Sequence, residues 1–390
     1  MTQIKKFPLH LLVASNESRL RYFNDYIAVH PAMEAAMKNL DEMASTLLDQ
    51  RLILLLGAAG VGKSELLKLF IRRRISQRVE QMTKNPQRVP GIFIELEAPV
   101  TGSFSFVPFY KEALATLGCV LPGKTLGSID RLAGKSVLRS IHIEAAGRKP
   151  SGEDLKARFT DSLMERKVEI CGLDEAVNAF KSAASLSEQQ RDRIVTDQAN
   201  KIKSMVNKSQ TTFALVGAFD FYQLTVGSAQ LARRSQIVHL QPYKSTEKDL
   251  VGFLVAFTDL LSQLPIEHDI DPSLHATEVF LQCLGCIGNL KNILKTALNK
   301  ALLRRLNLTI ELVRESFFSA PSLLKMKDEQ EAGVAGLNLF LSLEELADCV
   351  EKTPILITAH AKSEKASRNR LKPGETTPSH RQGAAKNWAE

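Results

Sequence analysis

The stretch LILLLGAAGVGKSELLKLF, residues 52–70, decides the fold class of this chain. The apolar run 52–56 predicts a buried strand, and the apolar spacing after the glycines predicts a helix. Between them, residues 57–64 fit the pattern G-x-x-x-x-G-K-[ST] without a mismatch. Glycines in such a loop let backbone amides converge on a phosphate group. The stretch therefore predicts a strand, a phosphate-binding loop (P-loop) and a helix.

The loop predicts a site for a nucleotide with Mg²⁺. Lys63 would reach the β- and γ-phosphates, and the hydroxyl of Ser64 would bind Mg²⁺. The alternative is a tight turn that only joins strand to helix, but the apolar strand before it and the helical run after it favour the nucleotide. The residues expected to hold the nucleotide are Gly57, Ala58, Ala59, Gly60, Val61, Gly62, Lys63 and Ser64.

Short apolar segments separated by helical patterns predict an α/β fold with a parallel sheet and helices on both faces. The five expected strands are 52–56, 91–96, 167–173, 212–216 and 236–240. From residue 245 onward the patterns are helical, which predicts a smaller all-helical domain after the sheet.

These patterns divide the chain into five parts. Near the start, a helix break is expected at His30-Pro31. The region 119–150 is rich in Gly, Lys and Arg without a clear period, which indicates an insertion or a functional loop. The expected parts are an N-terminal helical segment (1–45), a nucleotide-binding α/β domain (46–243) with the basic insertion (119–150), a helical lid (244–320), a C-terminal linker with weak helical character (321–357) and a polar, disordered basic tail (358–390).

The composition is that of a soluble globular protein, with 44% apolar and 24% charged residues. No apolar run approaches the roughly 18 residues of a membrane helix. The start resembles a signal peptide, but Pro8 and His10 interrupt its apolar part, so we expect a cytoplasmic protein without a membrane partner. The five cysteines give no disulfide framework, and the CxxC pair Cys283 and Cys286 is expected to be buried rather than to bind zinc.

An acidic pair, Asp174-Glu175, ends the third expected strand in VEICGLDEA, residues 168–176. Hydrolysis of a nucleoside triphosphate needs a carboxylate near Mg²⁺ and another group that polarises the attacking water. We assign Asp174 to Mg²⁺ and the nucleotide, and Glu175 to the water. The alternative is an ordinary acidic helix N-terminus, where Asp and Glu favour the helix dipole.

Two arginines, Arg233 and Arg234, precede the fifth expected strand. In ring-forming ATPases an arginine at this place can reach the γ-phosphate held by the neighbouring subunit. The alternative is a pair of solvated arginines at a helix C-terminus.

Basic residues gather in two regions, and the formal net charge of +8 permits a polyanionic partner. One region is IRRRISQR, residues 71–78, for which a solvated surface is a strong alternative. We expect the insertion, rather than this region, to contact the phosphodiester backbone of a nucleic acid. Such binding weakens steeply as the salt concentration rises. The residues proposed for it are Lys124, Arg131, Lys135 and Arg139.

The order of these parts resembles that of the AAA+ ATPases, and more narrowly the TniB/TnsC-type regulators of DNA transposition. The resemblance covers roughly residues 20–318. It lies in the P-loop, the acidic pair and three segments: VHPAMEAAMKNLDEMASTLLDQRLILLLGAAGVGKS, IELEAPVTGSFSFVPFYKEALATLG and QLARRSQIVHLQPY.

The resemblance implies an ATP-dependent regulator that assembles on double-stranded DNA as a homo-oligomeric ring or helical filament. Such proteins link a target-selector protein to a transposase. By position, Asp174 and Glu175 would form the Walker B pair, and Arg233 or Arg234 the arginine finger. Two departures from the family pattern bear on the rate of hydrolysis more than on ATP binding. Gly217-Ala218 stands where the family has a polar sensor residue, and Asn289 or Lys291 stands where many members have an arginine.

Two other functions remain open on the sequence. One is a helicase loader or initiator-type AAA+ ATPase, which would bind a replicative helicase rather than a transposase. The other is a P-loop signalling scaffold that binds nucleotide without hydrolysing it. We favour an ATPase that turns over slowly, because the P-loop and the acidic pair occur together.

Overall fold

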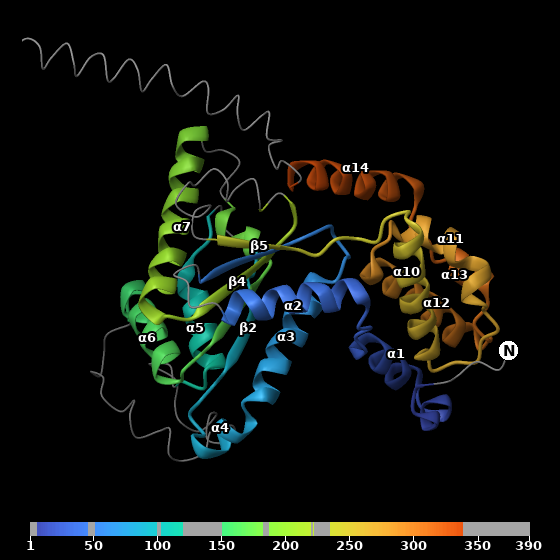
Figure 1. Cartoon of the computed structure of the whole chain (residues 1–390), viewed down its shortest axis with the longest axis horizontal. Coiled ribbons are helices and arrows are strands. Elements are labelled where there is room, and N and C mark those ends of the chain that lie inside the picture. Colours follow the sequence, from blue (N-terminus) through green and yellow to red (C-terminus); the bar gives the residue numbers. More distant parts are fainter. Residues whose placement is uncertain are drawn as a thin grey trace, which may run out of the picture. The chain divides into compact units, whose positions relative to one another are not determined.

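The computed structural model describes residues 6–45, 51–99, 103–119, 150–181, 187–219, 221 and 235–337 (Figure 1). By contacts between residues the chain divides after Gly336, so every described residue except Leu337 lies in one unit. Within these ranges no helix is long and apolar enough to cross a bilayer.

A five-stranded parallel sheet forms the α/β part, in the order β2-β3-β4-β1-β5. Every residue of β1 and β3 is buried, as their apolar composition requires. The predicted fold class, an α/β protein with a parallel sheet and a smaller helical domain, is confirmed. The strands are β1 (Leu52–Leu56), β2 (Gly91–Glu95), β3 (Ile170–Asp174), β4 (Thr212–Gly217) and β5 (Ser235–His239).

The start of β3 differs from its prediction of 167–173. Helix α6 (Gly152–Glu165) ends just before it, and Lys167 adopts a left-handed backbone with φ of 52°. Such a residue cannot continue an extended strand, so β3 begins only at Ile170. The strand also ends one residue later than predicted, so Asp174 is its last residue and its carboxylate lies at the carboxyl edge of the sheet.

Helices α2 (Pro31–Ser45) and α3 (Lys63–Gln77) pack on the sheet through one shared core. Pro31 begins α2, where its missing N–H costs nothing, so the break predicted at His30-Pro31 is confirmed. Leu40 of α2, Phe70 of α3 and Ile53 of β1 are fully buried in this core. The short helix α4 (Val79–Lys84) follows α3.

Helices α5 (Phe106–Thr116), α6 and α7 (Glu188–Ser209) pack against one another around aromatic side chains. Phe109 and Phe159 meet edge to face with their ring centroids 5.5 Å apart. The 3-10 helix η4 (Ala176–Phe180) follows β3 directly. Residues 120–149 of the basic insertion, which joins α5 to α6, lie outside the described residues.

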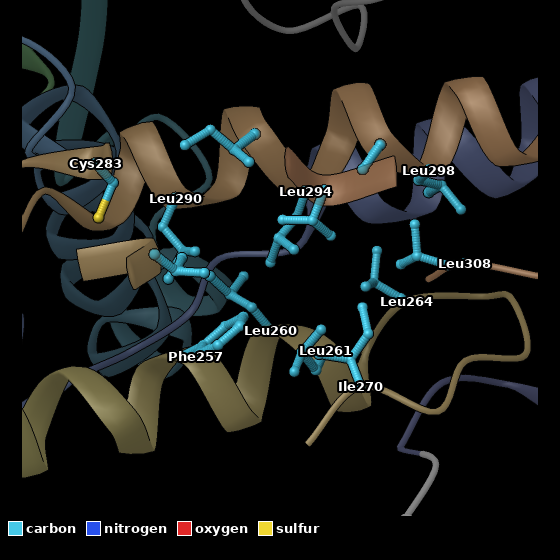
Figure 2. Packing of buried hydrophobic residues seen from close by; sticks show 14 of the residues in the cluster. Phe257, Leu260, Leu261, Leu264, Ile270, Cys283, Leu290, Leu294, Leu298 and Leu308 are labelled. Atoms are coloured by element: carbon cyan, nitrogen blue, oxygen red, sulfur yellow. The ribbon is translucent and has the colours of Figure 1, made fainter. Parts of the chain in front are cut away.

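The helical domain is built from α10 (Glu247–Ser262), α11 (Pro272–Cys283), α12 (Ile287–Arg304) and α13 (Ile310–Arg314). Figure 2 shows its core, in which Phe257 and Leu260 of α10 face Leu290 and Leu294 of α12. Cys283 and Cys286 are both fully buried, so the prediction that they are core residues is confirmed. Between residues 240 and 337 the only described β contact is the isolated bridge His268–Leu308.

The N-terminal segment contributes to the helical domain as well as to the sheet. It begins with the 3-10 helix η1 (Leu9–Val13) and α1 (Asn16–Asp25), which packs on α12. Phe23 of α1 is fully buried in the core of the helical domain, whereas α2 belongs to the core of the α/β part.

Residues 320–337 include the start of the segment expected as a linker with weak helical character. They form one continuous helix, α14 (Ala320–Leu337), with no buried residue. Apolar residues such as Leu324, which is 61% exposed, do not gather on a buried face, and the helical pattern of the sequence is correspondingly weak.

His30, between α1 and α2, makes the stability of this fold depend on pH. Its side chain is buried, with Nδ1 3.0 Å from the Tyr243 hydroxyl and Nε2 without a partner in the described structure. Burial lowers the pKa of His30 to about 4. A histidine in the unfolded chain titrates near 6.5, so the unfolded state takes up this proton first as the pH falls.

We therefore expect the free energy of unfolding to fall by about 3 kcal/mol between pH 6.5 and 4, and this contribution to be fully present above pH 6.5. Urea unfolding across this range would measure it. In His30→Gln the pH dependence should be smaller by that amount, whereas the exposed control His10→Gln should keep it. Equal pH dependence in His30→Gln and the parent would contradict the assignment.

Candidate phosphate-binding site

The P-loop joins β1 to α3 with two glycines in backbone conformations that other residues rarely adopt. Gly60 has φ of 75° and Gly62 has φ of 109°. A Cβ at Gly57 would come within 2.5 Å of the Leu240 carbonyl oxygen, so this position also requires glycine. The geometry of the loop therefore explains the two glycines of the sequence pattern, Gly57 and Gly62, as well as Gly60.

Lys63 is the first residue of α3, and its side chain folds back over the loop. Its ammonium group donates hydrogen bonds to the carbonyl oxygens of Gly57 and Ala58, both at 2.9 Å. Ser64 follows at the start of the helix, where backbone N–H groups lack partners within the helix. A cation held inside a glycine-rich loop at a helix N-terminus fits an anionic phosphate group.

The end of β5 lies beside this loop and adds a residue that the sequence did not indicate. His239 pairs in register with Leu56, the residue before the loop, and its Nε2 is buried without a partner in the described structure. Burial is the main cause that lowers the pKa of His239, and the charges of Lys244 and Lys63 lower it further. The imidazole is therefore a neutral group beside the P-loop lysine at pH 7.

The acidic pair lies at the same edge of the sheet, at the end of β3. With β4 between them, β3 and β1 are two strand spacings apart, or about 10 Å. Asp174 is only 5% exposed and accepts a hydrogen bond from the N–H of Glu175 at 2.9 Å. Glu175 is exposed and has φ of 50°, a left-handed conformation that is uncommon for a residue other than glycine.

Strand β4 ends between the acidic pair and the P-loop, and the described residues at its end, 217–219, carry no polar side chain. Gly217 ends the strand, and Ala218 and Phe219 line a cavity with Ala58 and Ala59 of the loop. In the structure, an apolar surface therefore lies where the family pattern has a polar sensor residue.

The helical domain touches the P-loop through the N-terminus of α12. The N–H of Asn289 donates to the carbonyl oxygen of Gly60 at 3.1 Å, and there is no room for a Cβ at Gly288 against the same carbonyl. The Asn289 side chain donates instead to the Cys283 carbonyl oxygen at 3.3 Å. Asn289 therefore reaches the loop through its backbone N–H, and its side-chain oxygen also lies against Gly60, where it leaves no room for a Cβ.

Lys291, the other residue noted in this part of the sequence, binds elsewhere. Its ammonium group donates to the carbonyl oxygen of Asn24 in α1 at 2.7 Å. Burial is the main cause that lowers its pKa, while the charge of Glu65 in the first turns of α3 raises it. Lys291 thus ties α12 to α1 near the beginning of α3.

The basic region 71–78 is in large part structural. Arg74 pairs with Asp41 at 3.1 Å, and Arg78 pairs with Glu169 at 2.8 Å. Arg88 binds the same Glu169 carboxylate at 2.7 Å. Since these guanidinium groups hold α2, α3 and β3 together, only Arg72 and Arg73 of the arginine run are exposed.

The remaining predicted site residues lie outside the described residues, so the structure does not test them. They are Arg233 and Arg234 before β5, and Lys124, Arg131, Lys135 and Arg139 in the insertion. Among the described residues, no group of three or more His, Cys, Asp or Glu side chains has the arrangement of a metal site. An Mg²⁺ ion would depend on Ser64, Asp174 and the phosphates of a nucleotide.

The sheet, the P-loop and the helical domain define the class of this protein: an α/β protein of P-loop type with a smaller helical domain. No protein-family model matches the sequence, and neither does any curated protein.

Among solved structures, the chain is similar to the Walker-type ATPase PABY2304 of Pyrococcus abyssi, with a TM-score of 0.42 and 18% identity over 82% of this chain and 76% of that chain. It is also similar to the Aeropyrum pernix ORC1 protein in complex with DNA, with a TM-score of 0.44 and 16% identity over 76% and 68% of the two chains. A third is Drosophila ORC bound to DNA, with a TM-score of 0.37 and 15% identity over 84% and 72%. At such low TM-scores the site must be assigned from the residues of this chain itself.

Proposed function

We propose that this protein binds ATP with Mg²⁺ at the P-loop and hydrolyses it slowly. The observation that supports this most is the position of Lys63, whose ammonium lies inside the glycine loop at the start of α3. Gly57 to Ser64 would hold the phosphates, while Ser64 and Asp174 would hold Mg²⁺, which neutralises phosphate charge when bound. Equilibrium binding of ATP with and without Mg²⁺ tests this, and a chain that binds neither form would contradict it.

Glu175 is the proposed water-orienting group. It is exposed at the edge of the sheet, one residue beyond the buried Asp174, and its left-handed backbone turns the chain into η4. Slow turnover is proposed because Ala218 and Phe219 supply no polar group beside the loop. A neighbouring subunit would contribute Arg233 or Arg234. A scaffold that binds ATP without hydrolysing it is the second candidate, and the same apolar strand end favours it.

We propose duplex DNA as the partner of the assembled protein. In the described structure a lysine cluster, Lys156 of α6 with Lys201 and Lys208 of α7, supports a polyanionic partner. Burial is the main cause that lowers the pKa of Lys156, and the charges of Lys208 and Lys201 lower it further. None of the three forms an ion pair with another described residue, and α6 directly follows the basic insertion in the sequence.

The biological process proposed is DNA transposition, in which the protein would form a ring or filament and link a target selector to a transposase. The support for this finer assignment is the sequence resemblance. Imaging with an ATP analogue and duplex DNA tests it through filament formation. Binding to a replicative helicase instead of a transposase would favour the initiator-type or helicase-loader alternative.

Neutralising the lysine cluster should weaken DNA binding and reduce its dependence on salt. Each lost phosphate contact lowers the slope of log K against log salt by about 0.9. We expect Lys201→Gln with Lys208→Gln to lower the slope by about 2 and to leave ATP binding unchanged. Fluorescence anisotropy of labelled duplex DNA at several salt concentrations measures this.

The matched control for this pair is Lys84→Gln. Lys84 is exposed on α4 and pairs with Glu80 at 2.6 Å, so its charge is already compensated. An unchanged salt slope in the double variant, together with DNA binding by the parent, would exclude the lysine cluster as the contact surface.

A further inference from the structure

A cavity of about 350 Å³ adjoins the P-loop, and α14 forms one of its walls. The loop contributes Ala58 and Ala59, the end of β4 contributes Ala218 and Phe219, and the helical domain contributes Leu284 and Asn289. The other lining residues all come from α14: Met326, Glu329, Gln330, Ala332 and Gly333. The space next to the phosphate-binding loop is therefore closed on one side by the last described helix.

The attachment of α14 to its surroundings is weak. None of its residues is buried. Gln330 donates a hydrogen bond to the Leu284 carbonyl oxygen at 3.4 Å, and the Cys286 thiol lies 3.7 Å from the Gln330 side-chain oxygen. Elements with few buried apolar contacts open at a low cost in free energy. Helix α14 therefore has the properties of an element that can leave its place while the cores stay folded.

The closest approach of α14 to the α/β part depends on a single glycine. A Cβ at Gly333 would overlap the ring of Phe219, which is the residue that follows β4 and lines the cavity. At Gly336, one turn further along the same helix, a Cβ would meet nothing within 4 Å. Glycine weakens a helix interior, so its presence at position 333 is explained by this contact rather than by helix stability.

The charge that α14 brings to the cavity is unfavourable for a triphosphate. Glu329 lines the cavity together with Ala58 and Ala59, and a carboxylate repels the negative oxygens of a phosphate chain. A wall that belonged to the binding site for ATP would be expected to carry neutral or cationic groups here.

We propose that α14 is a cap over the cavity beside Ala58 and Ala59 of the P-loop, which obstructs the site in the resting chain and must move away before a nucleoside triphosphate is held. This inference rests on the proposed binding of ATP at the P-loop. Nucleotide binding would then require that α14, at the C-terminal end of the unit Met1–Gly336, moves away from the P-loop.

Two alanine variants of the full chain test the cap. Gly333→Ala should push α14 away from Phe219, whereas Gly336→Ala gives the same gain in helix propensity without a steric effect. With a fluorescent ATP analogue and Mg²⁺, we expect Gly333→Ala to bind about tenfold more tightly than the parent. A cap that is closed in about 90% of molecules leaves about one molecule in ten able to bind, which weakens the apparent affinity of the parent by that factor. Gly336→Ala should bind like the parent.

A third variant keeps the helix intact and removes only the charge. Glu329→Gln should also tighten binding of the triphosphate, with a smaller change for ADP. If Gly333→Ala and Glu329→Gln both bind like the parent, or more weakly, α14 is not an inhibitory cap. Failure of the parent and of every variant to bind the analogue would instead refute the P-loop function itself, so the two failures are distinguishable.

Limited proteolysis reports the movement directly. Trypsin can cut after Lys325 and Lys327, both of which lie in α14. In the parent we expect cleavage there to become faster when ATP analogue and Mg²⁺ are added, and in Gly333→Ala to be fast from the outset. Slower cleavage of the parent on nucleotide addition would overturn the proposal, because α14 would then close over the ligand.

Discussion

Replacing Lys63 with Ala is expected to weaken ATP binding about 100-fold. Hydrogen bonds to a charged partner contribute roughly 1.5–3 kcal/mol, and each 1.4 kcal/mol is a factor of ten in affinity. In the structure the Lys63 ammonium already lies in the loop, bound to the carbonyl oxygens of Gly57 and Ala58. Phosphate oxygens would replace these neutral acceptors, and isothermal titration calorimetry with ATP and Mg²⁺ would measure the loss.

The control for this variant is Lys68→Ala on the same helix. Lys68 pairs with Glu65 at 3.2 Å, more than one turn beyond the loop, and its removal should change ATP affinity less than twofold. Thermal unfolding without nucleotide should show that both variants are folded. Equal affinity of Lys63→Ala and the parent would rule out the P-loop as the nucleotide site.

The second large effect is expected on turnover. Glu175→Gln should lower kcat by a factor of about 100 to 10,000, the usual contribution of a group that transfers a proton or orients water. ATP affinity should stay within about twofold, because Glu175 is exposed beyond the strand end and the buried Asp174 is the residue proposed to hold Mg²⁺. Phosphate release at saturating ATP, with and without duplex DNA, would measure the change.

Glu165→Gln is the matched control, since Glu165 is an exposed residue at the end of α6, away from the carboxyl edge of the sheet. Its turnover should equal that of the parent. A parent that binds ATP but releases no phosphate, even with DNA, would favour the scaffold over the ATPase. Undiminished turnover in Glu175→Gln would assign the water-orienting role to another residue.

Local patterns predicted the five strands and the P-loop because these features depend on residues near one another in sequence. A run such as 52–56 can be stable only when buried, and the glycines at 60 and 62 reflect backbone angles of the loop itself. The start of β3 was misplaced because the conformation of Lys167 depends on where α6 ends. The spacing of apolar residues does not show where a strand begins when its start depends on the end of the preceding helix.

Contacts between distant segments could not be predicted in this way. His239 next to the loop follows from the pairing of β5 with β1, and the backbone bond of Asn289 to Gly60 joins residues more than 200 positions apart. Helix α14 buries no residue and its sequence has only weak helical character, yet the helix lines the cavity beside the P-loop. These parts of the candidate site depend on tertiary structure.

The place of α1 in the helical domain has a consequence for how the chain folds during synthesis. Phe23 is made early, but its partners in the same core include Leu312, which the ribosome adds about 290 residues later. At 5–20 residues per second this interval lasts roughly 15–60 s. For that time the nascent chain exposes an apolar surface on α1 while the α/β part can already fold. Chaperones that shield N-terminal apolar segments would be expected to bind this protein on the ribosome.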